Sequence, residues 1–140
     1  MMNLRFPAFA LAALAFYGLG TAGGMAASPS GRFCGEMISS GDYQDVETSL
    51  NVAKDGHLSG TYELDEPDGR VEGNLIEKDL GSGTSRTLVW TDKYGTGLLS
   101  LDFSSDFDGF NGSWGGSVNG KFDAPSHSWN GARCGGGSVR

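Results

Sequence analysis

Four aromatic side chains, spread over four predicted strands, are the residues of this 140-residue sequence best suited to bind another molecule: Tyr62, Trp90, Trp114 and Trp129. Tyr and Trp join a large apolar ring to a hydroxyl or an N–H group, so they can enclose a small molecule and also hydrogen-bond it. The alternation of a strand puts Leu58, Gly60 and Tyr62 on one face, and Gly60 is expected to leave space beside the ring. We therefore expect an aromatic cup with the Tyr hydroxyl and Trp N–H groups as its polar contacts. The alternative is that the rings only fill the core.

Catalytic and metal-binding patterns are absent from the sequence. His57 and His127 are its only histidines, and no Gly-x-Ser-x-Gly motif is present. The acidic segment 65–68 falls at a predicted turn, where water keeps carboxylates ionised, whereas a glycosidase needs two facing carboxylates inside a cleft. Asp106 and Asp108 have the spacing of a calcium loop, but no acidic ligand follows at the required distance. We therefore expect no enzymatic activity, no metal and no cofactor.

The strands that must position the cup are indicated by a repeated five-residue pattern. In this pattern a central Gly is separated by one residue of any type from an apolar residue on each side. All three marked positions of the pattern face the same way in a strand. A Gly between two bulky residues on an inner face relieves crowding or lets the strand bend at a corner, as in small barrels. The pattern occurs at residues 33–37, 58–62, 71–75, 110–114 and, with Arg133 as its last residue, at 129–133.

Turn signals divide the chain into short strands. The dipeptides Asp55-Gly56, Asp68-Gly69, Asp108-Gly109 and Asn119-Gly120 favour the positive φ of tight hairpins. The runs between the turns alternate with period two, which predicts an all-β fold. Eight antiparallel strands paired in chain order would close into an up-and-down barrel, and a two-sheet sandwich is the alternative. We expect strands at 33–38, 45–53, 57–64, 70–77, 86–92, 97–103, 109–115 and 127–134, with a ninth near 117–122 if Asn119-Gly120 does not make a hairpin.

The two cysteines stand at the two ends of this strand series. Cys34 lies on the first predicted strand and Cys134 ends the last. An even number of cysteines in an exported chain predicts a disulfide, and two free buried thiols are the alternative. Because the first and last strands of an up-and-down barrel are neighbours, the disulfide would link the strands at the barrel seam.

The ends of the sequence indicate export. Residues 1–27 have the pattern of a signal peptide: Arg5, an apolar run over 6–19, and small residues before Ser28. Residues 28–134 are then a single barrel domain, and the Gly-rich segment 135–140 is a flexible tail. We expect a secreted or periplasmic protein. The net charge of −7 argues against binding to nucleic acid or to anionic membranes, since both require clustered positive charge.

Four segments resemble avidin and streptavidin. Residues 55–62 resemble the family's Asp-Gly-x-Leu-x-Gly-Thr-Tyr strand, whose tyrosine contacts biotin, and residues 88–94 resemble the strand with its first pocket tryptophan. Residues 110–116 and 128–129 resemble two later Trp or Tyr strands. The resemblance implies an up-and-down barrel with a ligand pocket. Residues 37–42 lack the Asn of the family's biotin loop, and no final Trp strand follows, so the resemblance implies the fold more than biotin itself.

These observations predict a non-enzymatic binding protein that recognises a small organic ligand or a secreted protein through one barrel mouth and its loops. A second interpretation is an inhibitor of a secreted enzyme, since small secreted β-barrels that inhibit bacterial metalloproteases also combine one disulfide with a barrel. That interpretation requires a filled barrel and an ordered N-terminal arm at Ser28–Arg32. A third is a structural or interaction domain with a filled core.

Overall fold

The computed structural model describes residues 27–135, all of it β-structure and connecting turns. Most of the predicted signal peptide and of the predicted tail therefore lies outside the described residues. Across residues 27–135, no helix of the length and apolar character needed to span a membrane is found. The strands are β1 (Gly31–Ser39), β2 (Asp42–Val52), β3 (Leu58–Glu66), β4 (Gly69–Glu77), β5 (Ser85–Asp92), β6 (Gly95–Phe103), β7 (Gly109–Trp114), β8 (Ser117–Val118), β9 (Lys121–Phe122) and β10 (His127–Arg133).

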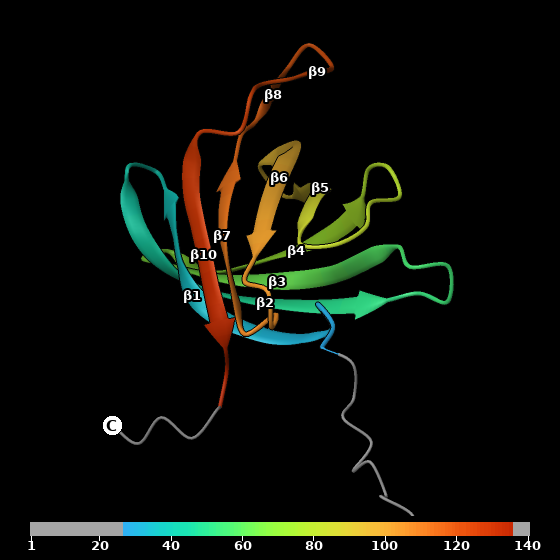
Figure 1. Ribbon diagram of the computed structural model, residues 1–140. Helices are drawn as coiled ribbons and strands as arrows, with labels where there is room; N and C mark the ends of the chain where they lie inside the picture. Colours follow the sequence, from blue (N-terminus) through green and yellow to red (C-terminus); the bar gives the residue numbers. More distant parts are fainter. Residues whose placement is uncertain (1–26, 136–140) are drawn as a thin grey trace, which may run out of the picture.

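Eight of these strands form a closed antiparallel barrel in the order β1-β10-β7-β6-β5-β4-β3-β2 (Figure 1). Each barrel strand pairs with its neighbours in the chain, so the predicted up-and-down barrel is confirmed and the sandwich is not. The predicted strand positions agree with the observed ones to within a few residues at their ends. Closure leaves none of the eight barrel strands as an edge strand with unpaired backbone groups.

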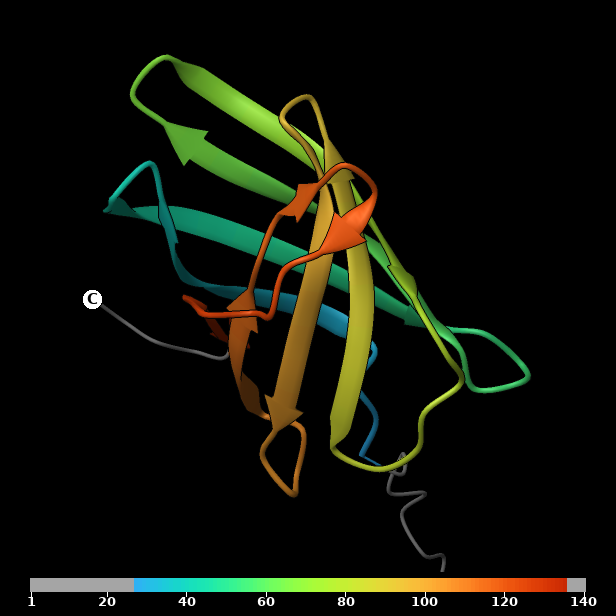
Figure 2. The same ribbon diagram turned by 90° about the horizontal axis from the view of Figure 1, so that it is seen from above.

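The segment 117–122 does not form a ninth barrel strand. Asn119 and Gly120 have φ values of 51° and 77°, so they make a tight turn between the two-residue strands β8 and β9. This hairpin extends beyond the ends of β7 and β10 (Figure 1) and lies beside β6 (Figure 2). The Ser117 hydroxyl donates a 2.8 Å hydrogen bond to the Thr96 carbonyl on β6.

The disulfide joins the barrel seam as predicted. β1 pairs with β10, with Cys34 opposite Ala132, and Cys34 is bonded to Cys134 with a Cα–Cα distance of 5.0 Å. The backbone N–H of Cys134 also donates to the carbonyl of Arg32. The covalent bond therefore connects two strands that already pair through the backbone.

The turns follow the predicted chemistry with one exception. Gly56 and Gly69 take positive φ, as the Asp-Gly signals require, and the Ser40-Gly41 turn between β1 and β2 does so as well. Before β7 the positive φ falls on Phe107 and not on Gly109. There Asp106 accepts hydrogen bonds from the Ser104 hydroxyl and the Asp108 N–H, an Asx-type turn that sets the loop conformation.

One end of the barrel, here called the closed end, is filled by side chains. Phe33 packs against Phe103 and Phe110 with ring centroids 5.8 and 5.4 Å apart. The guanidinium of Arg133 covers Phe33 at 4.6 Å and donates a 2.6 Å hydrogen bond to the carbonyl of Ser28. These contacts also hold the beginning of the domain against the barrel.

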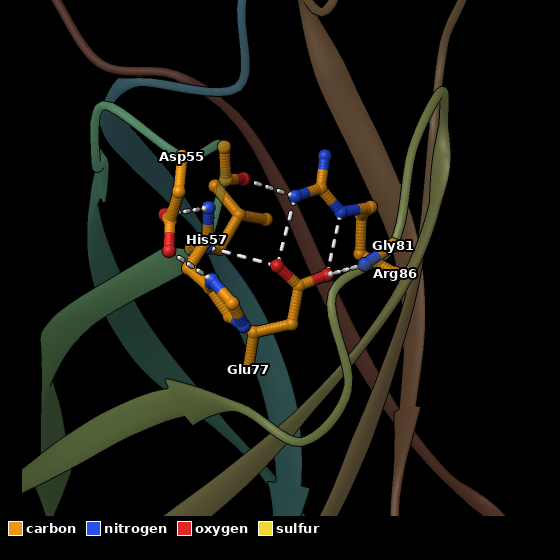
Figure 3. A network of polar contacts seen from close by, with 7 residues as sticks. Asp55, His57, Glu77, Gly81 and Arg86 are labelled. Atoms are coloured by element: carbon orange, nitrogen blue, oxygen red, sulfur yellow. Dashed lines mark hydrogen bonds and ion pairs between the residues drawn. The ribbon is translucent and has the colours of Figure 1, made fainter.

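A buried ion pair completes the closed end (Figure 3). Glu77 on β4 and Arg86 on β5 are joined by two hydrogen bonds of 2.6 and 2.8 Å, and the Glu77 side chain is fully buried. Its carboxylate also accepts the backbone N–H groups of Leu58 and Gly81, while Arg86 donates to the Gly56 carbonyl. Burial alone would raise the pKa of Glu77, but the bonds from Arg86 and the backbone outweigh it and lower the pKa. The network ties β4 and β5 to the loop that precedes β3.

Candidate ligand-binding site

The opposite end of the barrel, here called the mouth, contains a cavity of about 290 Å³. All four predicted aromatic residues line it, so the cup predicted from the sequence is assembled as a geometric feature. The volume is near the lower limit of known small-molecule sites, about 300 Å³. The lining residues are Met37, Ser39, Ser40, Tyr62, Leu64, Trp90, Asp92, Tyr94, Trp114 and Trp129. We call this space the mouth cavity.

Strand alternation directs the aromatic residues inward, and glycines on neighbouring strands leave room for the rings of Tyr62 and Trp90. Each of three rings has a Gly as its cross-strand partner: Tyr62 faces Gly73, Trp90 faces Gly97 and Trp129 faces Gly112. Placing an aromatic residue opposite a strand glycine covers the exposed backbone. The predicted role of Gly60 was wrong, because a Cβ there would collide with the carbonyl of Ser49 on β2. Gly73 is the residue whose missing side chain accommodates the Tyr62 ring.

Tyr62 is fixed at the mouth by a hydrogen bond. Its hydroxyl donates to Asp92 Oδ2 on β5 at 2.6 Å. Burial of the ring raises the pKa of Tyr62 above its ordinary value, and the hydrogen bond to the Asp92 carboxylate raises it further. Tyr62 is therefore neutral at physiological pH, and its hydroxyl engages Oδ2 of Asp92.

The tryptophan N–H groups are engaged within the protein. The Nε1 atoms of Trp90 and Trp114 donate to backbone carbonyls, of Gly115 and Ile38 respectively, both at 2.9 Å. Trp129 Nε1 donates to the Thr48 hydroxyl at 3.1 Å. The expectation that these groups serve as polar contacts for a ligand was therefore wrong. Their bonds instead hold the rings in place, so the cavity walls are preorganised.

The four rings form two edge-to-face pairs. Tyr62 and Trp129 have centroids 4.8 Å apart and an interplanar angle of 75°, and Trp90 and Trp114 have values of 5.6 Å and 88°. Each pair therefore makes a corner of aromatic surface. Tyr62, Trp90 and Trp129 are buried to at least 93 %, whereas Trp114 is half-buried at the side of the cavity.

Polar groups at the rim of the cavity were not predicted. Asp92 Oδ1 accepts the backbone N–H of Tyr94 at 2.8 Å. Glu66, at the end of β3, accepts the hydroxyls of Ser39 and Tyr94 at 2.9 and 2.8 Å. Asp92 could have been predicted, because it stands two residues after Trp90 on the same strand and its side chain therefore points to the same, inner face. The contact between Tyr94 and Glu66 joins two loops and carries no comparable sequence pattern.

The two histidines lie outside the mouth cavity lining. His57 is hydrogen-bonded to Asp55 at 2.8 Å beside the network at the closed end (Figure 3), and His127 packs against Trp114 with a centroid distance of 4.9 Å. Within residues 27–135, one group of side chains has the spacing of a metal site: Cys34, Glu47 and Cys134. Its two sulfur atoms form the disulfide. The Glu47 carboxylate is then the one remaining ligand of this group, and a single carboxylate is too few ligands for a metal site.

A larger hollow of about 400 Å³ lies on the outer face of β1 to β4, beside the disulfide. Its walls are mainly charged, and Arg70 forms exposed ion pairs there with Glu63 and Asp65 at 3.3 Å. Exposed pairs of this kind contribute little to binding or stability. The mouth cavity is smaller, but its lining of aromatic surface with a few polar groups is that of a ligand site.

Comparison with models of protein families, with curated protein sequences and with solved structures gives no match for this chain. The resemblance to avidin and streptavidin therefore stays a prediction about the family. Fold and site chemistry are the two sources of functional inference, and a fold by itself specifies no function.

Proposed function

We propose that this protein is a non-enzymatic binding protein that holds a small organic molecule in the mouth cavity. One observation carries the proposal: Tyr62, Trp90, Trp114 and Trp129 come from four different strands and converge on one cavity. Aromatic residues that served only as core would be expected to leave no space between them, because protein interiors pack densely.

The rigidity of the walls supports this function. Every tryptophan N–H around the cavity is bonded to the protein, and Tyr62 is bonded to Asp92. A site that is already formed loses little conformational entropy when a ligand enters. The cavity has room for roughly ten water molecules, which favours a compact ligand over a peptide.

We propose further that the protein acts outside the cytoplasm, as a secreted or periplasmic protein. The disulfide between Cys34 and Cys134 supports this location, because such bonds persist in oxidising compartments. The signal pattern predicted over residues 1–27 agrees with it.

Inhibition of a secreted enzyme through an N-terminal arm has less support. Arg133 donates to the carbonyls of Ser28 and Ser30, so the start of the domain lies against the closed end. The interior is filled near that end by phenylalanine and leucine residues but open at the mouth. A barrel whose interior served only as a hydrophobic core would be filled at both ends.

Titration of the purified protein with biotin and a panel of small heterocycles and small amines, followed by tryptophan emission and calorimetry, tests the proposal. A true ligand shifts the emission of the cavity tryptophans. Trp114→Leu should weaken the binding of this ligand at least tenfold, because it removes one wall of the cavity. Tyr43→Leu, at an exposed aromatic residue outside the cavity lining, is the matched control and should bind as the natural protein does. If no compound binds and crystals soaked with the panel show an empty cavity, the proposal is wrong.

A further inference from the structure

We infer that the ligand of the mouth cavity is an organic cation, an alkylated ammonium compound; this rests on the proposed function. The aromatic corners, the charge of the rim and the scarcity of free donors in the lining lead to this inference. They are three separate observations on the same site.

The aromatic walls suit a cation. The face of a Trp or Tyr ring attracts a positive charge within about 6 Å of its centroid, and Trp does so most strongly. Alkylated ammonium groups are held in cages of such rings because they are large, weakly hydrated and have apolar surface. The four rings line the cavity as two perpendicular pairs, Tyr62–Trp129 and Trp90–Trp114.

The rim of the cavity carries two carboxylates that form no ion pair within residues 27–135. Asp92 lines the cavity, and Glu66 is bonded to the lining residues Ser39 and Tyr94. Both carboxylates accept hydrogen bonds from neutral donors, and neither takes part in an ion pair within residues 27–135. A bound cation would supply the missing opposite charge.

Two groups that can carry positive charge contact aromatic residues of the lining. The ammonium of Lys93 is 5.0 Å from the ring centroid of Tyr94, and His127 packs against Trp114. Neither residue lines the cavity. The lining itself contains no Lys, Arg or His, so the only formal charge in it is that of Asp92.

The lining is also poor in hydrogen-bond donors. The tryptophan N–H groups and the hydroxyls of Tyr62, Tyr94 and Ser39 are already used. Ser40 at the rim is left to donate to a ligand. An anionic ligand would meet the Asp92 carboxylate without compensating donors, which is unfavourable in a partly buried site. A cation needs no donor from the protein.

Three probes of nearly the same shape and different charge test the inference: choline, 3,3-dimethylbutan-1-ol and 3,3-dimethylbutanoate. Calorimetry should show choline binding at least tenfold more tightly than the alcohol, and no binding of the carboxylate. Asp92→Asn should weaken choline roughly tenfold more than it weakens the alcohol, because only choline loses an opposite charge. Asp102→Asn is the matched control, because Asp102 accepts a hydroxyl hydrogen bond from Ser85 on the exposed surface away from the cavity.

The comparison of the three probes in the natural protein needs no variant, so it stands even if Asp92→Asn does not fold. If the alcohol binds as tightly as choline, or the carboxylate binds, the cation inference is wrong and the proposed function stands. The same conclusion holds if only neutral heterocycles from the panel bind. If neither these probes nor the panel binds, both proposals fail.

Discussion

Tyr62 and Asp92 are hydrogen-bonded at 2.6 Å although a whole strand, β4, lies between the strands that carry them. The bond exists because β4 presents Gly73 opposite Tyr62, and the tyrosine ring crosses the strand at the position where a side chain is missing. A glycine in the sheet therefore decides whether a cavity residue reaches its partner.

Gly73→Ala should destabilise the fold and disturb the mouth. An added Cβ would overlap the Tyr62 ring and force it away from Asp92. Overpacking of this kind costs about 1 to 3 kcal/mol of unfolding free energy, which urea unfolding measures. Gly116→Ala is the control, because a Cβ there meets no atom within 4 Å. Equal stability of the two variants would contradict the role given to Gly73.

The raised pKa of Tyr62 predicts a loss of stability at alkaline pH. The folded state holds the phenolic proton more tightly than the unfolded state, so this contribution is complete below the unfolded pKa of about 10 and is lost as pH rises above it. Tyr62→Phe should therefore lose less unfolding free energy between pH 9 and 11 than the natural protein. Tyr43→Phe, at an exposed tyrosine, should behave as the natural protein does.

Removing the disulfide should lower stability without changing the strand order. The bond closes a segment with a sequence separation of 100 residues, for which the chain-entropy model gives about 4 to 5 kcal/mol. The Cys34→Ser, Cys134→Ser double variant should melt at lower temperature with an unchanged far-ultraviolet circular dichroism spectrum. Reducing agent should lower the melting temperature of the natural protein and not that of the variant. A collapse of the β-spectrum would show that the seam depends on the covalent bond.

Glu77→Gln should destabilise the closed end by about 3 to 5 kcal/mol, because it leaves Arg86 without its charged partner in a buried site. Glu72→Gln on the exposed face of the same strand should be nearly neutral. Chemical unfolding at pH 7 measures both.

The ion pair between Glu77 and Arg86 also predicts that the stability of the fold decreases at acidic pH. The pKa of Glu77 is lowered in the folded protein, so its contribution to stability is complete above the unfolded value of about 4.3 and is lost as pH falls below it. Unfolding of the natural protein should therefore become easier on acidification. The Glu77→Gln variant should show a smaller change over the same interval, whereas an equal change would show that other carboxylates account for it.

Much of the fold was predictable because it depends on local rules. Alternation sets which face each residue takes, and Asp-Gly or Asn-Gly pairs set where hairpins turn. The disulfide followed from topology, since Cys34 lies on β1, Cys134 directly follows β10, and these two strands must be neighbours in a closed barrel. The convergence of the four aromatic residues followed from the same alternation.

The contacts inside the barrel were less predictable. That Gly73 and not Gly60 accommodates Tyr62 depends on the register between β3 and β4, which alternation alone does not specify. The buried pair of Glu77 and Arg86 was missed because charged residues on an inward face contradict the usual pattern unless their partner is known. The tryptophan N–H bonds depend on rotamers and loop positions that no sequence pattern describes.

The bond between Cys34 and Cys134 makes the polypeptide between them a covalent macrocycle that contains almost the whole barrel. A protease that cuts one loop of a macrocycle opens the ring without releasing a fragment. Because the strands pair in chain order, a single cut in a connecting loop also leaves every strand beside both of its neighbours. A nicked molecule would thus keep its mass in a non-reducing gel and its mouth cavity in solution, and it would separate into two pieces only after reduction and unfolding.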